Sequence, residues 1–141
     1  MYLTKNKIQM RDFCGEPGDF TAGAEVLFFG RVRNHNEGRQ VLYLDYEAYE
    51  SMAEDMIEDC LRQACARWPL TQARILHKTG RVALGEIAVA IQVCAAHRDE
   101  AYKASRFLID EIKHRVPIWK KEFFVDGTAE WGSCRHEVAS C

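Results

Sequence analysis

The chain has 141 residues, of which 48% are hydrophobic and 28% are charged, and its formal net charge is −2. This size suits one domain with its own core, so we expect residues 1–141 to form a single domain, and the composition excludes a disordered or fibrous protein. Proteins that live on nucleic acid usually carry a clear positive excess, so the slightly acidic balance argues against nucleic-acid binding and requires any basic site to be local.

Two strands are expected in the first third of the chain. Residues 24–33 are apolar and partly β-branched before they reach two arginines, which is typical of a strand that emerges from a core. Residues 34–40 have the composition of a loop. Residues 41–49 alternate in their side-chain character and predict a second strand, which could lie antiparallel to the first.

A helix is expected to follow. Ser51 and Glu54 form the S-x-x-E pattern of a capping box, so the helix should begin there and run as far as Pro69. Apolar residues recur at intervals of three and four and predict one wide buried stripe. Its members are Met52, Met56, Ile57, Cys60, Leu61, Ala64, Cys65 and Trp68.

The second half predicts two strands and another helix. Residues 73–80 and 86–96 resemble strands on either side of the turn-rich stretch GRVALG, and the second is apolar enough to be central in a sheet. Asp99 can cap a helix that ends before Pro117, because the residue before a proline disfavours helical geometry. The expected inner face of this helix contains Ala101, Ala104, Leu108 and Ile112.

The end of the chain completes the expected fold. Residues 118–124 predict a final strand or an extended arm, and residues 126–141 predict a polar tail. The element order indicates an α+β fold, an α/β sandwich in which two main helices pack on a mixed, largely antiparallel sheet.

The N-terminus and the cysteines indicate a cytoplasmic protein. The opening stretch MYLTKNKIQMRDF lacks the pattern of a secretory signal, and no apolar run is long enough to span a bilayer, so no membrane association is expected. The six cysteines include no C-x-x-C pair and are expected to be thiols. Cys60 and Cys65 point to different faces of the expected helix, which argues against a zinc site.

Three basic clusters fall at the ends of expected elements. In an acidic protein such clusters favour a pocket for an anion, and phosphate is the obvious candidate. They consist of Arg31, Arg33 and His35; of His97 and Arg98; and of Lys113, His114, Arg115, Lys120 and Lys121.

Each cluster also has a structural explanation. Lys113 and its neighbours could simply complement the dipole at a helix end, and His97 could be a structural histidine. Arg31 and Arg33 could pair with Glu47 or Glu50. Lys120 could be an exposed lysine that protects an edge strand, or a half-buried lysine beside other cations that acts as a nucleophile or base.

Four segments of the chain, taken together, resemble the large catalytic subunit of molybdopterin synthase in order and spacing. They are GRVRNHNEG at 30–38, AAHRDEAYKA at 95–104, IKHRVPIWKKE at 112–122 and DGTAEW at 126–131. The resemblance extends from about Ala24 to Arg135. Any one segment is a weak signal, whereas the combination is specific.

The resemblance implies sulfur transfer to a pterin, without a metal or another cofactor. A small ubiquitin-like sulfur-carrier subunit inserts its C-terminal Gly-Gly thiocarboxylate, and cyclic pyranopterin monophosphate receives sulfur twice to become the dithiolene of molybdopterin. The family also implies a homodimer within a heterotetramer. The implied catalytic residues are Lys113 and Lys120, and the implied substrate-binding residues are Arg31, Arg33, His97, Arg98, Lys121, Glu122 and Arg135.

Two other classes of function compete with this interpretation. A binding module for a ubiquitin-like tail or a phosphorylated ligand would keep the arginines without needing both lysines. An unrelated Schiff-base enzyme would use Lys120 alone. Nucleic-acid binding ranks last, because basic and aromatic residues alternate in only one segment.

Overall fold

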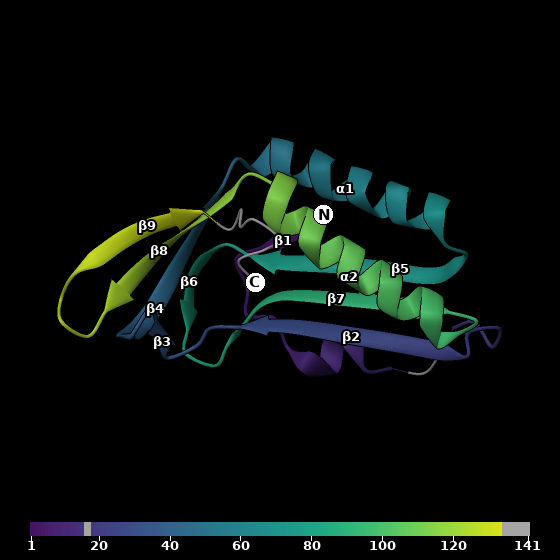
Figure 1. Cartoon of the computed structure of the whole chain (residues 1–141), viewed down its shortest axis with the longest axis horizontal. Helices are drawn as coiled ribbons and strands as arrows, with labels where there is room; N and C mark the ends of the chain where they lie inside the picture. The colour runs from purple at the N-terminus through teal and green to yellow at the C-terminus, as the bar shows by residue number, and fades with distance from the viewer. Residues whose placement is uncertain (16–17, 134–141) are drawn as a thin grey trace.

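The computed structural model describes residues 1–15 and 18–133, which form two β-sheets with both α-helices on one face of the first sheet (Figure 1). The α+β class predicted from the sequence is confirmed. The expected strands are divided between two sheets, and the second sheet projects beyond the ends of the helices (Figure 1).

The first sheet has the order β1-β5-β7-β2. All nine residues of β7 are buried, and β7 is antiparallel to the strands on both sides, so the predicted central strand is confirmed. A continuous apolar strand of this kind needs cover on both of its faces. The strands are β1 (Leu3–Thr4), β5 (Leu70–Lys78), β7 (Ile87–Ala95) and β2 (Ala24–Arg31).

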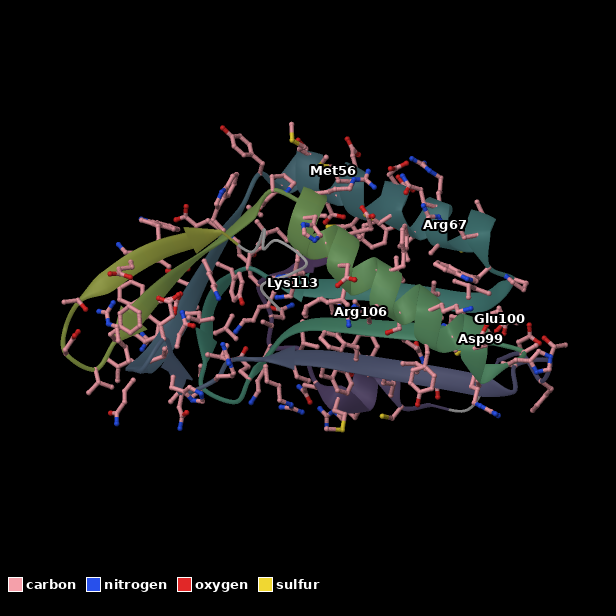
Figure 2. The ribbon with its side chains drawn as sticks, in the orientation of Figure 1. Met56, Arg67, Asp99, Glu100, Arg106 and Lys113 are labelled. Atoms are coloured by element: carbon pink, nitrogen blue, oxygen red, sulfur yellow. The ribbon has the colours of Figure 1, made fainter. Side chains whose placement is uncertain are left out.

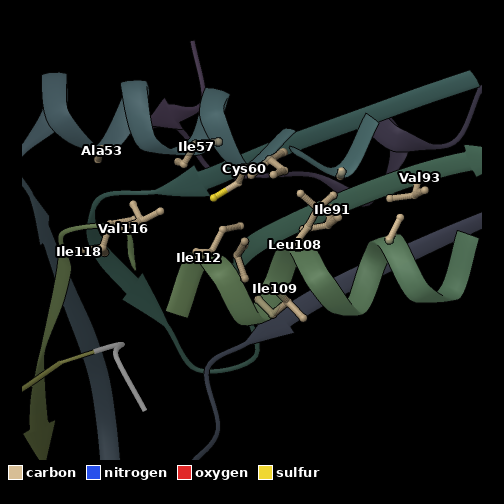
Figure 3. Close-up of a cluster of buried hydrophobic side chains, with 14 of the residues drawn as sticks. Ala53, Ile57, Cys60, Ile91, Val93, Leu108, Ile109, Ile112, Val116 and Ile118 are labelled. Carbon is tan, nitrogen blue, oxygen red and sulfur yellow. The ribbon is translucent and has the colours of Figure 1, made fainter. Parts of the chain in front are cut away.

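The main core lies between this sheet and the helices α1 (Glu50–Arg67) and α2 (Arg98–Arg115). Figure 3 shows Leu108 and Ile112 of α2 on the side facing Ile57 and Cys60 of α1, with Ile91 of β7 next to Leu108. The predicted inner face of α2 is confirmed, since all four of its residues are buried. The interior is therefore built mainly from medium-sized aliphatic side chains.

The second sheet has the order β3-β4-β8-β9, with β6 paired to β4. Strand β8 follows α2 directly and pairs with β4 and β9, so residues 118–124 form an interior strand of this sheet. The predicted polar tail is wrong over residues 129–133, and the turn-rich stretch after residue 79 also contains a strand. The strands are β3 (His35–Asn36), β4 (Arg39–Ala48), β6 (Gly80–Ala83), β8 (Ile118–Phe124) and β9 (Ala129–Ser133).

The predicted loop at 34–40 contains a tight hairpin between β3 and β4. Glu37 and Gly38 both have positive φ angles, 51° and 77°, which is typical of the two-residue turns that match the twist of paired strands.

Strand β2 ends at Arg31 instead of residue 33, with a bulge between Gly30 and Arg31. A short 3-10 helix, η1 (Met10–Phe13), lies before β2 in the chain.

The predicted capping box is wrong. Helix α1 begins at Glu50 after Tyr49, and no side chain caps it. The carboxylate of Glu54 instead accepts hydrogen bonds from the backbone N–H groups of Tyr2 at 2.7 Å and Leu3 at 3.0 Å. The Glu54 carboxylate, which the sequence pattern assigned to the start of the helix, is therefore bound by the N-terminal strand instead.

The helix faces also differ in detail from the sequence prediction. The buried stripe of α1 contains Ala53, Ile57, Cys60 and Ala64, whereas Met52 is 53% exposed and Cys65 is exposed. At α2 the N-cap residue is His97 instead of Asp99, and it makes no side-chain capping bond. The Asp99 carboxylate lies 3.0 Å from the Lys103 ammonium on the helix surface.

Candidate active site

A cavity of about 200 Å³ lies where the two sheets meet the C-terminal end of α2. Strands β2 and β7 of the first sheet form one side, and β3, β4 and β8 of the second sheet form the other. Six of the residues singled out from the sequence line it. They are Arg31, Arg33, His35, Lys113, Lys120 and Glu122.

The two lysines reach this cavity from consecutive elements. Lys113 lies in the last turn of α2, directly after the buried Ile112, and Figure 2 shows it at the end of the helix nearest the second sheet. The helix ends before Pro117, and Lys120 lies on β8 between Ile118 and Glu122 on the same strand face. The bend after α2 thus brings the two half-buried amines to one cavity.

The alternation of β8 directs Lys121 to the opposite face. Its ammonium nitrogen lies 5.3 Å from the centre of the Phe123 ring and 5.4 Å from that of Trp131. Both distances are within the range of a cation–π contact. Lys121 therefore does not line the cavity that its neighbours Lys120 and Glu122 line.

Glu122 is a carboxylate with 8% exposure in a largely cationic cavity. The side-chain amide of Asn36 donates to both of its oxygens, at 3.0 and 2.9 Å. The tight hairpin after β3 positions Asn36 for this contact. The sequence analysis gave Asn36 no role, although it lies in the segment GRVRNHNEG, one of the four that carried the resemblance.

The two arginines lie at and beyond the end of β2. Arg31 Nη1 donates to the carbonyl oxygen of Gly85 at 2.7 Å, which ties this side chain to the turn before β7. Arg33 is exposed at the rim. Within residues 1–15 and 18–133 neither arginine pairs with Glu47 or Glu50, so the structural alternative is not observed there.

A buried histidine that the sequence analysis did not single out also lines the cavity. His77 of β5 is 4% exposed, and its Nδ1 lies 2.8 Å from the carbonyl oxygen of Lys78. Burial lowers the pKa of His77 to about 4; the bond to Lys78 opposes this change and the charge of Lys113 adds to it. The ring meets Tyr46 edge to face, with centroids 5.1 Å apart. His77 is therefore a neutral group in a cationic cavity.

His97 and Arg98 lie at the other end of α2. Lys113 follows Arg98 by fifteen residues, which corresponds to roughly 22 Å along a helix. Figure 2 shows Asp99 and Glu100 at that end and Lys113 at the opposite end. His97 and Arg98 are thus exposed and remote from the cavity of the same chain. Arg135 lies outside the described residues.

The cavity combines four cationic side chains with one held carboxylate and the imidazoles of His35 and His77. Such a site can bind an anion and offers lysine amines for proton transfer beside it. No group of side chains suited to a metal ion occurs within the described ranges. No helix of that part of the chain has the length and apolar character needed to cross a bilayer.

Comparison with known proteins points to one family. The family model described as MoaE protein matches residues 3–115. The molybdopterin synthase catalytic subunit of Thermoplasma volcanium is 40% identical over 129 residues, which are 92% of this chain and 94% of the relative.

Solved structures agree with this match. The structure of molybdopterin synthase from Staphylococcus aureus superposes with a TM-score of 0.86 at 36% identity, over 94% of this chain and 96% of that one. A chain in the complex of subunits 1 and 2 of molybdopterin-converting factor from Helicobacter pylori has a TM-score of 0.74 at 19% identity, with 93% and 88% covered. That second likeness shows the fold alone.

Proposed function

Because the chain belongs to the MoaE protein family, we propose that it is the catalytic subunit of molybdopterin synthase. It transfers sulfur from the C-terminal thiocarboxylate of a small ubiquitin-like partner to cyclic pyranopterin monophosphate, and two transfers produce the dithiolene of molybdopterin. The observation that carries the proposal is the single cavity lined by Lys113, Lys120 and Glu122 together with two arginines.

The cations of the cavity suit both reactants, which are anionic. Arg31 and Arg33 at the rim attract the phosphate of the precursor, and charge-assisted bonds of this kind favour arginine. In each transfer the thiocarboxylate sulfur bonds to a carbon of the precursor while a carbon–oxygen bond at that same carbon breaks, and the departing oxygen takes up a proton. Water then cleaves the thioester to the partner, whose tail leaves as a carboxylate.

The two lysines divide the acid–base work of these steps. One exchanges protons with the reacting oxygen and with the attacking water, and the other neutralises charge on the pterin or on the acyl tail. Proton transfer by a positioned side chain contributes a factor of roughly 10² to 10⁴ in rate. Glu122, held by both of its oxygens, keeps a fixed negative charge beside Lys120 on the same strand face.

A second copy of the chain is needed to use the residues at the start of α2. His97 and Arg98 are exposed and roughly 22 Å from Lys113, so they serve a cavity only if they belong to a neighbouring subunit. We therefore propose a homodimer with one small partner at each end, a heterotetramer, in which these residues and Arg135 bind substrate across the dimer interface. Lys121 faces away from its own cavity and would also have to act elsewhere.

A cytoplasmic location is part of the proposal. Cys14, Cys60, Cys65 and Cys94, the cysteines of the described residues, are all free thiols. Thiols are the expected form in a reducing compartment.

The test is dithiolene formation from cyclic pyranopterin monophosphate and the thiocarboxylated partner. Lys113→Ala and Lys120→Ala should each reduce kcat about 100-fold or more, while both variants still bind the partner. Lys5→Ala, which removes an exposed lysine outside the cavity lining, is the matched control and should match the wild type. If the folded wild type binds the partner but forms no product, the protein is a docking module and the proposal fails.

A further inference from the structure

We propose that His77 is a positioning residue of this cavity, and that its Nε2 accepts a hydrogen bond from the ammonium group of Lys113. In this role the imidazole holds the lysine towards the reactants and does not itself exchange protons with them. The inference deepens the proposed function and rests on it for its kinetic consequences. Its structural part can be tested without any turnover.

The tautomer of His77 follows from its hydrogen bond. The carbonyl oxygen of Lys78 can only accept, so the Nδ1 atom that lies 2.8 Å away must carry the proton. In a neutral imidazole the other nitrogen then has a free lone pair. Nε2 is thus an acceptor, and it has no hydrogen-bond partner in the part of the chain that the structure describes.

The ring is held in a fixed place at the cavity wall. His77 lies on β5 of the first sheet, and Tyr46 of β4 in the second sheet packs against it edge to face. The bond to the main chain and the contact with Tyr46 restrain the ring from two sides, and the side chain is almost fully buried. A side chain restrained in this way can orient another group.

Lys113 is the donor that we assign to this acceptor, although the structure does not itself bond the two groups. It is half-buried, it lines the same cavity, and it forms no hydrogen bond or ion pair within residues 1–15 and 18–133. Its charge is close enough to contribute to the lowered pKa of His77, as expected when a cation faces a neutral imidazole. The carboxylate of Glu122, which Asn36 holds in place, forms no ion pair with Lys113 within residues 1–15 and 18–133.

Two substitutions separate this role from a structural one. His77→Asn retains an N–H donor near the position of Nδ1 and has no acceptor near that of Nε2. His77→Gln reaches further, so its amide oxygen can replace Nε2, but the bond to Lys78 is weakened. If His77 has only a structural role, the Asn variant should keep more activity than the Gln variant. If His77 positions Lys113, the Gln variant should keep more.

The kinetic test uses the complete assembly with the thiocarboxylated partner. We expect His77→Asn to lower kcat about tenfold or more with little change in KM or in partner binding, and His77→Gln to recover most of this loss. Thermal unfolding of both variants checks that they are folded. Equal losses in the two variants, or a better Asn variant, would overturn the inference.

The second test is independent of activity, so it separates this inference from the proposed function. In ¹⁵N NMR spectra of the protein near neutral pH, His77 should be neutral with its proton on Nδ1. The Nζ resonance of Lys113 should shift in His77→Asn and return towards its wild-type position in His77→Gln. A proton on Nε2, or a Lys113 resonance that does not respond to His77→Asn, would refute the contact even if the wild type is an active synthase.

Discussion

Mild acid should destabilise the fold through His77. Burial keeps this imidazole neutral in the folded state, where its pKa is about 4, against an ordinary value of 6.5 in the unfolded chain. Below pH 6.5 the unfolded state binds a proton that the folded state does not, so stability present above that pH is lost as the pH falls towards 4. The complete loss corresponds to about 3 kcal/mol, of which about 2 kcal/mol should be gone near pH 5.

The assay is the free energy of unfolding in urea, measured for the wild type and for His77→Asn between about pH 7.5 and about pH 5. The variant keeps a donor near the carbonyl oxygen of Lys78 and has no group that titrates in this range. The wild type should therefore lose about 2 kcal/mol more than the variant over the interval. Carboxylates such as Asp59, whose pKa the hydrogen bond from Arg115 lowers, respond at lower pH. Parallel pH curves for the two proteins would refute the reasoning.

Two further predictions concern the fold. Glu54→Ala should cost roughly 1–3 kcal/mol, because it leaves the backbone N–H of Tyr2 without its charged acceptor, and it should speed amide exchange at that residue, whereas Ser51→Ala should change neither quantity. Gly23→Ala should lower Tm by several degrees, because a Cβ at this position would meet the carbonyl oxygen of Ala96, and that oxygen belongs to the main chain; an unchanged Tm would show that the segment shifts freely.

The elements that were predicted well carry their signal locally. Strand β7 is a continuous apolar run, and the inner face of α2 repeats at helical spacing, so each is visible without knowledge of its partner. Strands β6 and β9 were missed because both are short and partly polar. Strand β6 is stabilised by pairing with β4, which lies far away in the sequence, and β9 by pairing with β8 across a turn. The failed capping box has the same cause, since Glu54 is occupied by the N-terminal strand.

The site was predicted in part for comparable reasons. The resemblance assigned Lys113 and Lys120 to one active site, and the structure places both in the lining of one cavity. The expected length of the second helix could also have shown that His97 and Lys113 lie at opposite ends of it, so that they cannot share a cavity within one chain. His77 gave no signal, because one histidine in a strand does not reveal which groups the neighbouring sheet places around it. Its contact with Tyr46 exists only once the two sheets meet.

The corner between α2 and β8, formed by Val116, Pro117 and Ile118, limits which substitutions this sequence can accept. Val116 and Ile118 are fully buried around Pro117, whose carbonyl oxygen accepts a hydrogen bond from the backbone N–H of Tyr49 at 3.2 Å. The start of one helix, the end of the other and the strand that bears Lys120 are therefore joined at one point. Substitutions there alter the spacing of the two amines without touching either, so neighbouring changes must compensate one another. The corner should accordingly accumulate replacements in correlated sets, while the exposed face of α1 varies one residue at a time.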